Sequence, residues 1–504
     1  PLDFLHSHSL SRMTKQIKIK NEEIKMIMKG TNEQEEIWNE IANGESHVMV
    51  YAGAGTGKTF TIVQSAKSVS GKKGFLAFNR SIANELGDKL PSDCEAMTFH
   101  SLGLSSIKMQ NRGARVDNKK VYKIIKNVLG RYKSAPALVK LVSLSKSSLV
   151  DANDRDSLLA LIDEYNIEFD GLAERNTALD YFPTIINNCM DISTVDFDDM
   201  IWLPVVMELP VKHYDVLFVD EAQDFNEVQR SLILKACNGG RMIVVGDPKQ
   251  AIYGFRGADS GSMDIFRTTL ANSSRGVKIF PLSITWRCPS SVVAEANRFF
   301  KDYSCRDDAP EGEVNVNCSF SPKVGDLVLC RTNAPLVSEC FNLIAQGVPA
   351  YVLGRDIGFS LKALVKKVTE NGSLRIEQFI PQFESHIEIA KEAFRRADKE
   401  KAVQSLEDKA QCILHLTGNT STVQGLLDNI DKIFGDGKKR GVIFSTIHKA
   451  KGLEADNVWI LKPEIMPHPM AKSLSDKAQE RNLCYVAITR AKKTLNYVGQ
   501  KVGK

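Results

Sequence analysis

Short runs of consecutive apolar residues recur along the chain, separated by longer stretches of mixed character. Residues 48–51, 216–219 and 242–245 are continuous apolar runs of strand length, and residues 74–78 form a similar run. Strands that are apolar on both faces are typical of a parallel sheet covered by helices on both sides. Residues 48–51 are followed by a glycine-rich turn and a helical stretch from Lys58. This order of strand, loop and helix predicts the first unit of a parallel α/β sheet.

A second group of apolar runs follows in the C-terminal half of the chain. Its predicted strands are residues 277–282, 326–330, 350–353, 441–445, 457–461 and 495–498. The strand pattern disappears between residues 360 and 440, where charged stretches such as 388–401 indicate helices. Residues 104–190 are also mostly helical in pattern. The sequence therefore predicts two α/β cores, each interrupted by a helical insert.

These patterns place boundaries along the chain. The residues before Met13 are interpreted as a non-native leader and are left out of the fold. The predicted leader is residues 1–12. The first core consists of residues 13–105 and 190–275, with its helical insert at residues 106–189. The second core consists of residues 276–359 and 441–504, with a smaller helical insert at residues 360–440.

The composition is that of an ordinary globular protein, with 43% hydrophobic and 25% charged residues. No apolar run approaches the roughly 20 residues that a membrane-spanning helix needs, so no membrane partner is predicted. The ten cysteines are scattered singly, without a CxxC pair or a cluster at metal-ligand spacing. This pattern is typical of reduced thiols in a cytoplasm, and it argues against a zinc or iron–sulfur site.

The net charge of +5 averages two opposed blocks. Residues 108–146 hold eleven Lys and Arg residues and one acidic residue, Asp117. Residues 151–224 hold eighteen Asp and Glu residues against three basic ones. Such asymmetry predicts one surface for a polyanion and a second surface that is acidic. The alternative is that both blocks are solvated helical faces without a partner.

Residues 52–59 match the phosphate-binding P-loop, with Ala52 in the place of the first glycine. Glycines in such a loop let backbone N–H groups surround phosphate oxygens at a helix N-terminus, whose dipole favours anions. Lys58 would reach the β- and γ-phosphates of ATP, and the Thr59 hydroxyl would hold Mg²⁺. The residues predicted to bind ATP through this loop are Gly53, Ala54, Gly55, Thr56, Gly57, Lys58 and Thr59.

A P-loop enzyme also needs carboxylates on a neighbouring strand, and Asp220 and Glu221 directly follow the apolar run 216–219. Asp220 would hold Mg²⁺ through water, and Glu221 would polarise the attacking water. An Asp-Glu pair at a strand end is by itself often only solvated. The P-loop in the same predicted sheet favours the catalytic interpretation.

With these motifs the chain resembles superfamily 1 DNA helicases of the UvrD/Rep type. One such segment can occur by chance, whereas an ordered series is specific. The series consists of Gln34, the P-loop, and residues 78–83, 98–101, 196–199, 220–224, 246–258, 286–287, 446–454 and 485–492. Residues 78–83 and 331–333 are most similar to the F-box DNA helicase branch, although the sequence contains no F-box. The resemblance implies two RecA-like P-loop NTPase cores with parallel sheets, each carrying a mostly helical insert.

The resemblance assigns further residues to the nucleotide. Gln34 would read the adenine edge, although it also completes a capping box that begins at Thr31. Trp286 would stack on the adenine, in place of the tyrosine that is more usual in the family. Glu454 would contact the ribose or the region of Mg²⁺ and phosphate. The residues implied to approach the γ-phosphate are Gln250, Arg287 and Arg490.

The resemblance also implies a track for single-stranded DNA. Tyr253 and Phe255 would stack on successive bases, a contact that tolerates any sequence, unless they only pack the core. His100 and His448 are equally well explained as structural histidines. The basic block 108–146 falls in the first insert, where DNA would be held electrostatically. The residues implied to line the track are Phe78, Asn79, Thr98, His100, Tyr253, Phe255, Thr446 and His448.

Together these features predict an ATP-dependent single-stranded DNA translocase and DNA helicase, driven by Mg-ATP hydrolysis between the two cores. The family resemblance implies 3′→5′ movement. Two alternatives stay open: a P-loop switch that does not move along DNA, and a DNA-stimulated ATPase subunit that regulates a nuclease or repair protein. The expected partners are single-stranded DNA and its junctions with duplex, and the expected state is a monomer or weak oligomer. The expected compartment is the cytoplasm of a bacterial or phage-infected cell, or a eukaryotic nucleus.

Overall fold

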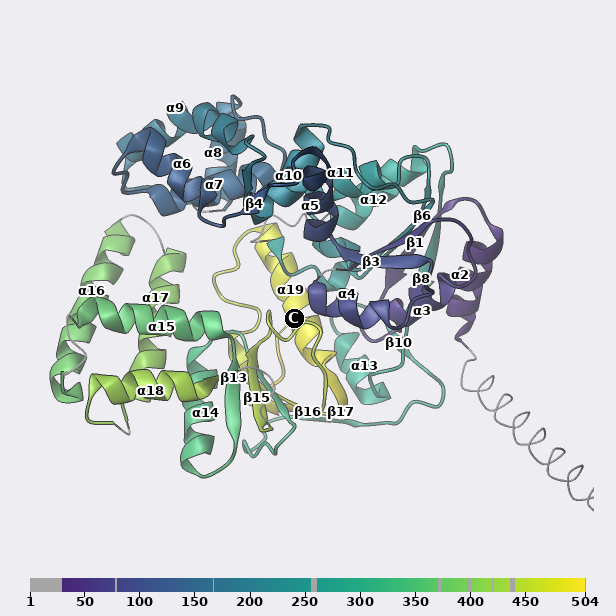
Figure 1. The fold of residues 1–504 in the computed structure, drawn as a ribbon. Helices are drawn as coiled ribbons and strands as arrows, with labels where there is room; N and C mark the ends of the chain where they lie inside the picture. Colours follow the sequence, from purple (N-terminus) through teal and green to yellow (C-terminus); the bar gives the residue numbers. More distant parts are fainter. Residues whose placement is uncertain are drawn as a thin grey trace, which may run out of the picture.

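Two parallel sheets with helices on their faces form the two cores of the protein (Figure 1). The computed structural model describes residues 30–77, 79–165, 167–254, 261–369, 374–396, 400–418, 420–435 and 440–503. The predicted leader, residues 1–12, and the predicted DNA contacts Phe78 and Phe255 lie outside the described residues. Among the described helices, none is both long and apolar enough to cross a lipid bilayer.

The first sheet contains six parallel strands among the described residues, in the order β3-β2-β6-β7-β1-β8. Residues of β1 alternate between two apolar cores, with Val48 and Val50 on one face of the sheet and Met49 on the other. The strands are β1 (His47–Ala52), β2 (Lys73–Ala77), β3 (Cys94–Thr98), β6 (Val216–Val219), β7 (Arg241–Gly246) and β8 (Val277–Leu282). Its helices are α2 (Asn32–Asn43), α3 (Lys58–Ser65), α4 (Arg80–Gly87), α5 (Phe99–Gln110), α10 (Phe197–Val206), α11 (Glu227–Ala236) and α12 (Ser262–Ala271), with short turns η1 (Ala222–Asp224) and η2 (Pro248–Gln250).

The second sheet has seven parallel strands in the described part of the chain, in the order β11-β17-β16-β12-β15-β13-β14. They are β11 (Glu313–Asn315), β12 (Leu327–Cys330), β13 (Ala350–Leu353), β14 (Phe434–Gly435), β15 (Val442–Thr446), β16 (Ala455–Leu461) and β17 (Ala491–Val498). Its helices are α13 (Ser290–Ala296), α14 (Ala334–Ala345) and α19 (Leu474–Ile488), with the turn η4 (Pro463–Ile465). β9 (Ile284–Thr285) and β10 (Ser304–Cys305) form a separate two-stranded parallel sheet.

One predicted strand belongs to the other core. The apolar pattern predicts that residues 277–282 open the second core, but β8 pairs along its whole length with β1 at the edge of the first sheet. The first core therefore extends past the predicted boundary at residue 275. The apolar pattern of an edge strand indicates that it is a strand, but it does not specify which sheet the strand joins, because pairing is a tertiary contact.

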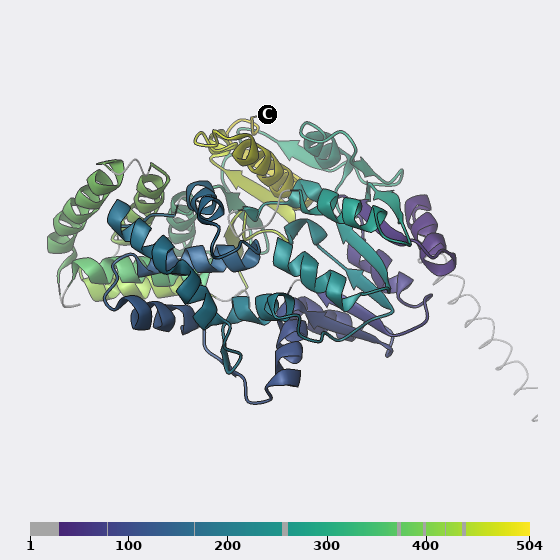
Figure 2. The ribbon, with the colours of Figure 1, turned by 90° about the horizontal axis from the view of Figure 1, so that it is seen from above.

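Each core carries a mostly helical insert, which confirms the predicted fold class. The first insert contains α6 (Lys120–Leu129), α7 (Ala135–Ser147), α8 (Arg155–Glu164) and α9 (Leu172–Cys189), and is closed at its base by β4 (Arg115–Val116) paired with β5 (Thr194–Val195). The second contains α15 (Arg355–Val368), α16 (Ile376–Arg396), α17 (Glu400–Leu416) and α18 (Val423–Ile433). Figures 1 and 2 both place the two inserts at the end of the molecule opposite α2.

A buried ionic cluster ties the first insert to α10. Asp199 accepts from Lys120 Nζ and from Lys146 Nζ, each at 2.7 Å, and its side chain is fully buried. Lys146 also lies 3.4 Å from Asp196, which caps α10. Two lysines of the basic block are therefore internal. The expectation that the whole block is a surface for a polyanion is wrong at Lys120 and Lys146.

Candidate active site between the two cores

The P-loop connects β1 to α3 and lies against the segment that carries Arg287. Gly57 caps α3 with a φ of +82°, and Gly55 has a φ of +68°. Residues with side chains rarely adopt either conformation. A Cβ on Gly55 would also lie 2.5 Å from the Cβ of Arg287. The two glycines therefore permit both the turn of the loop and the close approach of the Arg287 segment.

The predicted metal ligands meet where α3 begins and β6 ends. Thr59 Oγ1 donates to Asp220 Oδ2 at 2.9 Å. Hydroxyl and carboxylate oxygens are donors that Mg²⁺ prefers, so the pair fits the predicted ion. Lys58 Nζ donates to the carbonyl oxygen of Gly53 at 3.3 Å, across the loop that would hold the phosphates.

Asp220 and Glu221 are neighbouring carboxylates with opposite shifts in pKa. Burial, followed by the charge of Glu221, raises the pKa of Asp220. Burial also acts to raise the pKa of Glu221, but the ammonium groups of Lys58 and Lys451 outweigh it, so the pKa of Glu221 is lowered. Glu221 is thus the group held as a carboxylate, which is the state needed to polarise a water molecule.

The predicted adenine contacts flank Gly57. Gln34 is buried, its Oε1 accepts from the N–H of Thr31 at 3.0 Å, and its Nε2 donates to Thr61 Oγ1 at 2.9 Å. The capping box that begins at Thr31 is therefore formed, and a contact of Gln34 with adenine stays a prediction. Trp286 is 44% exposed, and the guanidinium of Arg306 lies 4.5 Å from its ring centroid.

Residues from beyond the first core complete a cavity of about 600 Å³ at the P-loop. Arg287 Nε donates to Glu454 Oε2 at 2.7 Å, and Lys492 Nζ lies 2.6 Å from Glu454 Oε1. Three predicted nucleotide contacts, Trp286, Arg287 and Glu454, therefore line one cavity with the P-loop. The lining residues are Gly55, Thr56, Gly57, Lys58, Thr59, Phe60, Glu221, Trp286, Arg287, Glu454 and Lys492.

Arg490 lies beside Gln250 and is not among the residues that line this cavity. Its side chain is 1% exposed, and Nη2 is 3.4 Å from Gln250 Oε1. Nε and Nη1 donate to the carbonyl oxygens of Val486 and Leu453. Burial lowers the pKa of Arg490 to about 10, so it is still a cation at neutral pH. Its approach to the γ-phosphate stays a prediction.

Hydrogen bonds connect Gln250 to Glu221 through residues to which the sequence assigned no role. Gln250 Nε2 donates to Asp247 Oδ2 at 2.6 Å, the N–H of Asp247 donates to Gln223 Oε1 at 2.8 Å, and Gln223 Nε2 donates to Glu221 Oε2 at 2.5 Å. These residues lie within the recognised segments 220–224 and 246–258, but only their contacts reveal the connection.

Lys451 is a further residue to which the sequence assigned no role, and it joins this network from the second core. Its buried ammonium donates to Asp224 and to the carbonyl oxygen of Gln250, and lies 3.7 Å from Glu221. It also lies 5.2 Å from the ring centroid of Tyr253. Tyr253 in turn donates to the carbonyl oxygen of His448 at 3.3 Å. Tyr253, a predicted DNA contact, and Glu221, the predicted general base of hydrolysis, therefore both lie beside Lys451.

The other predicted DNA contacts have local structural roles in the described chain. Asn79 Oδ1 accepts from Ile82 N–H at the start of α4. Thr98 forms a capping box at the start of α5. His100 is edge-on to Phe197, and burial lowers its pKa. Thr446 ends β15 and is also buried. Their contact with DNA stays a prediction.

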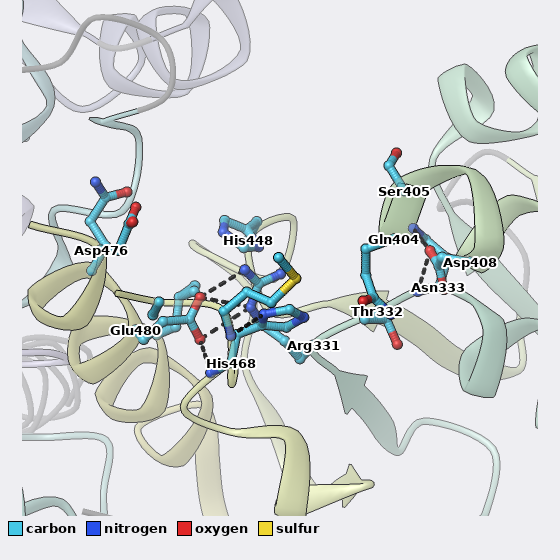
Figure 3. A pocket seen from close by; sticks show the side chains of 14 residues that line it. Arg331, Thr332, Asn333, Gln404, Ser405, Asp408, His448, His468, Asp476 and Glu480 are labelled. Carbon is cyan, nitrogen blue, oxygen red and sulfur yellow. Dashed lines mark hydrogen bonds and ion pairs between the residues drawn. The ribbon is translucent and has the colours of Figure 1, made fainter. Parts of the chain in front are cut away.

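His448 lines a further cavity of about 370 Å³, here called the insert cavity (Figure 3). It lies between the second core and helix α17 of its insert. No sequence pattern indicates this cavity, since its walls come from segments far apart in the chain. The lining residues are Arg331, Thr332, Asn333, Gln404, Ser405, Asp408, His448, His468, Met470, Ala471, Asp476, Gln479, Glu480 and Leu483.

Two helicase domain profiles match this chain, one over its N-terminal half and one near its C-terminus. The profile of the UvrD/REP helicase N-terminal domain matches residues 32–271, and that of the UvrD-like helicase C-terminal domain matches residues 441–498. F-box DNA helicase protein 1 of Schizosaccharomyces pombe is 24% identical, over 92% of this chain and 57% of its own length. F-box DNA helicase 1 of Gallus gallus is 23% identical, over 93% and 49%. ATP-dependent DNA helicase PcrA of Bacillus subtilis is 21% identical, over 90% and 81%. The chain thus spans about half the length of the two F-box relatives.

Proposed function

The chain belongs to the UvrD/Rep family of superfamily 1 helicases, and we propose that it is an ATP-dependent DNA helicase that translocates on single-stranded DNA. One observation carries the proposal. The cavity of about 600 Å³ is walled by Lys58 and Glu221 on one side and by Arg287 and Glu454 on the other. A nucleotide bound there would contact both cores, so its hydrolysis would change how they sit against each other.

The residues of the cavity divide the chemistry of ATP hydrolysis between them. Lys58 would move from the carbonyl of Gly53 to the β- and γ-phosphates of ATP. Mg²⁺, held by Thr59 and Asp220, would neutralise charge that develops on those phosphates. Glu221 would orient and polarise the attacking water. Arg287 would exchange part of its pairing with Glu454 for the γ-phosphate, which a guanidinium meets in bidentate fashion.

Coupling to DNA would run through the contacts between Gln250, Lys451 and Tyr253. A base that stacks on Tyr253 would stabilise the position of a ring that already lies against the Lys451 ammonium. Lys451 lies beside Glu221 and hydrogen bonds to the carbonyl of Gln250. A change in the position of Lys451 would therefore reach both ends of the hydrogen-bond network that connects Gln250 to Glu221. We therefore expect single-stranded DNA to stimulate ATP hydrolysis.

The experiment measures ATP hydrolysis with and without single-stranded DNA, and strand displacement on duplexes that carry one single-stranded tail. We expect hydrolysis to rise with DNA, and displacement to require a 3′ tail, as for 3′→5′ movement. DNA-stimulated hydrolysis without displacement from either tail would instead favour an ATPase subunit that regulates a nuclease or repair protein. Hydrolysis indifferent to DNA would favour the P-loop switch.

A further inference from the structure

The insert cavity adjoins the predicted DNA track. His448, whose carbonyl accepts from Tyr253, forms part of its lining. A Cβ on Gly254 would lie 2.4 Å from Gln479 Nε2, so the α19 wall touches the residue after Tyr253. We propose that this cavity takes one nucleobase of the bound single strand, and that Gln404 and Ser405 of the insert contact that base. The inference rests on the proposed function, which supplies the strand.

Three charged side chains of the cavity, Arg331, Glu480 and Asp408, are paired within the protein. Arg331 donates to both carboxylate oxygens of Glu480: Nε and Nη2 lie 2.9 and 2.7 Å from Oε1, and Nε lies 3.2 Å from Oε2. The carboxylate of Asp408 accepts from the backbone N–H groups of Asn333 and Ala334 and from Asn333 Nδ2, at 2.8–3.1 Å. Because these charges already have partners, the cavity offers little attraction to an ionic ligand.

Two neutral polar side chains of the cavity are available to meet a ligand. In the described chain, the exposed side chains of Gln404 and Ser405 have no hydrogen-bond partner. Amide and hydroxyl groups of this kind recognise the donor and acceptor edges of bases. Met470 and Leu483 supply apolar contact for a base. The volume of about 370 Å³ falls in the range of small-molecule pockets.

A phosphate group fits this cavity poorly. The carboxylates of Asp408, Asp476 and Glu480 all lie in its lining, and Arg331 is engaged by Glu480. A backbone phosphate needs unpaired cations or N–H donors, whereas a base needs neutral hydrogen-bonding edges and a face to pack on. The lining therefore favours the base over the backbone of the strand.

Asp408 positions the insert side of the cavity. Gln404, Ser405 and Asp408 lie within one turn of α17, and Figure 3 shows them across the cavity from Asp476 and Glu480. The bonds of Asp408 to the start of α14 fix this turn against the second core. The insert thereby becomes a wall of the strand track.

The test compares the double variant Gln404→Ala/Ser405→Ala with the wild-type chain. Both positions are exposed on a helix, where alanine is well tolerated, so folding is preserved. We expect the DNA concentration for half-maximal ATPase stimulation to rise about tenfold, as for the loss of two ordinary hydrogen bonds. ATP hydrolysis without DNA is expected to stay unchanged. The matched control is Gln382→Ala/Ser385→Ala, at exposed positions of α16 outside the cavity.

Single-stranded oligonucleotides with one abasic site at successive positions then locate the base. At one position, an abasic site is expected to weaken DNA binding by the wild type. The double variant already binds DNA more weakly, and the abasic site at that position is expected to weaken its binding no further. An effect equal to that of the control, or a loss that is the same at every abasic position, would overturn the inference. So would a flattening of the log K against log [salt] slope by about 0.7, because that is the signature of one fewer phosphate bound by the protein. If the wild type shows no response to DNA at all, the proposed function fails and this inference fails with it.

Discussion

Replacing Asp199 by alanine is expected to loosen the first insert strongly while leaving the P-loop intact. Asp199 is fully buried and joins Lys120 of α6 and Lys146 of α7 to α10. Without its carboxylate, Lys120 keeps the carbonyl oxygens of Cys189 and Asp191 at 2.7 and 2.9 Å. Lys146 keeps a single carboxylate contact, to Asp196 at 3.4 Å. The variant therefore leaves a buried ammonium with poor compensation.

The magnitude follows from that loss. Removing one partner of a buried ion pair costs about 3–5 kcal/mol, because the remaining charge stays desolvated. Asp199 also accepts from the N–H of Asp196 in the capping box of α10, and removing this hydrogen bond adds up to about 1 kcal/mol. The carbonyl partners of Lys120 moderate the cost. We expect the free energy of local unfolding of the insert to fall by about 4 kcal/mol.

Hydrogen exchange resolved by peptide is the suitable assay, because a chain with several cores need not unfold in one step. At about 1.4 kcal/mol per factor of ten, amides of α6, α7 and α10 should exchange roughly a thousand times faster. The control Asp156→Ala removes an exposed carboxylate of α8 and should change exchange little. Replacing the cluster by apolar residues, Lys120→Met/Lys146→Met/Asp199→Leu, should restore protection. Exchange in Asp199→Ala within about fivefold of wild type would refute the argument that these charges are buried and mutually dependent.

Four further outcomes test the active site and the basic block. Lys58→Ala should abolish ATP hydrolysis and leave thermal unfolding unchanged, because the loop contributes little packing; a large fall in Tm would contradict this. Glu221→Gln should retain ATP binding by calorimetry while kcat falls by about 10²–10⁴, and loss of binding would remove Glu221 from the role of base. Arg490→Ala should lower kcat more than it raises KM, since its charge is needed mainly in the transition state; a change in KM alone would show a different role. Lys119→Ala/Lys123→Ala should flatten the salt dependence of single-stranded DNA binding by about 0.7 for each phosphate that is no longer bound, and an unchanged slope would mean a solvated helical face.

Much of this protein could be predicted from local sequence. The P-loop is determined by residues 52–59, because its turn depends on which positions tolerate positive φ, and Gly55 and Gly57 occupy them. The apolar runs indicated both parallel sheets, since a strand buried on both faces must be apolar throughout. The motif series also identified the family and most residues that line the nucleotide cavity.

Contacts between distant segments could not be predicted in this way. Lys119 and Lys120 are adjacent and chemically identical, yet Lys119 is exposed and Lys120 is buried against Asp199. A lysine lies inside only where a carboxylate from elsewhere in the chain compensates its desolvation. The pairing of β8 with β1 also depends on contacts between segments far apart in the chain, as does the position of Lys451 between Asp224 and Tyr253. Sequence determined the local backbone and the chemical groups available, and the tertiary structure decided which groups meet, because burial and charge pairing depend on the whole fold.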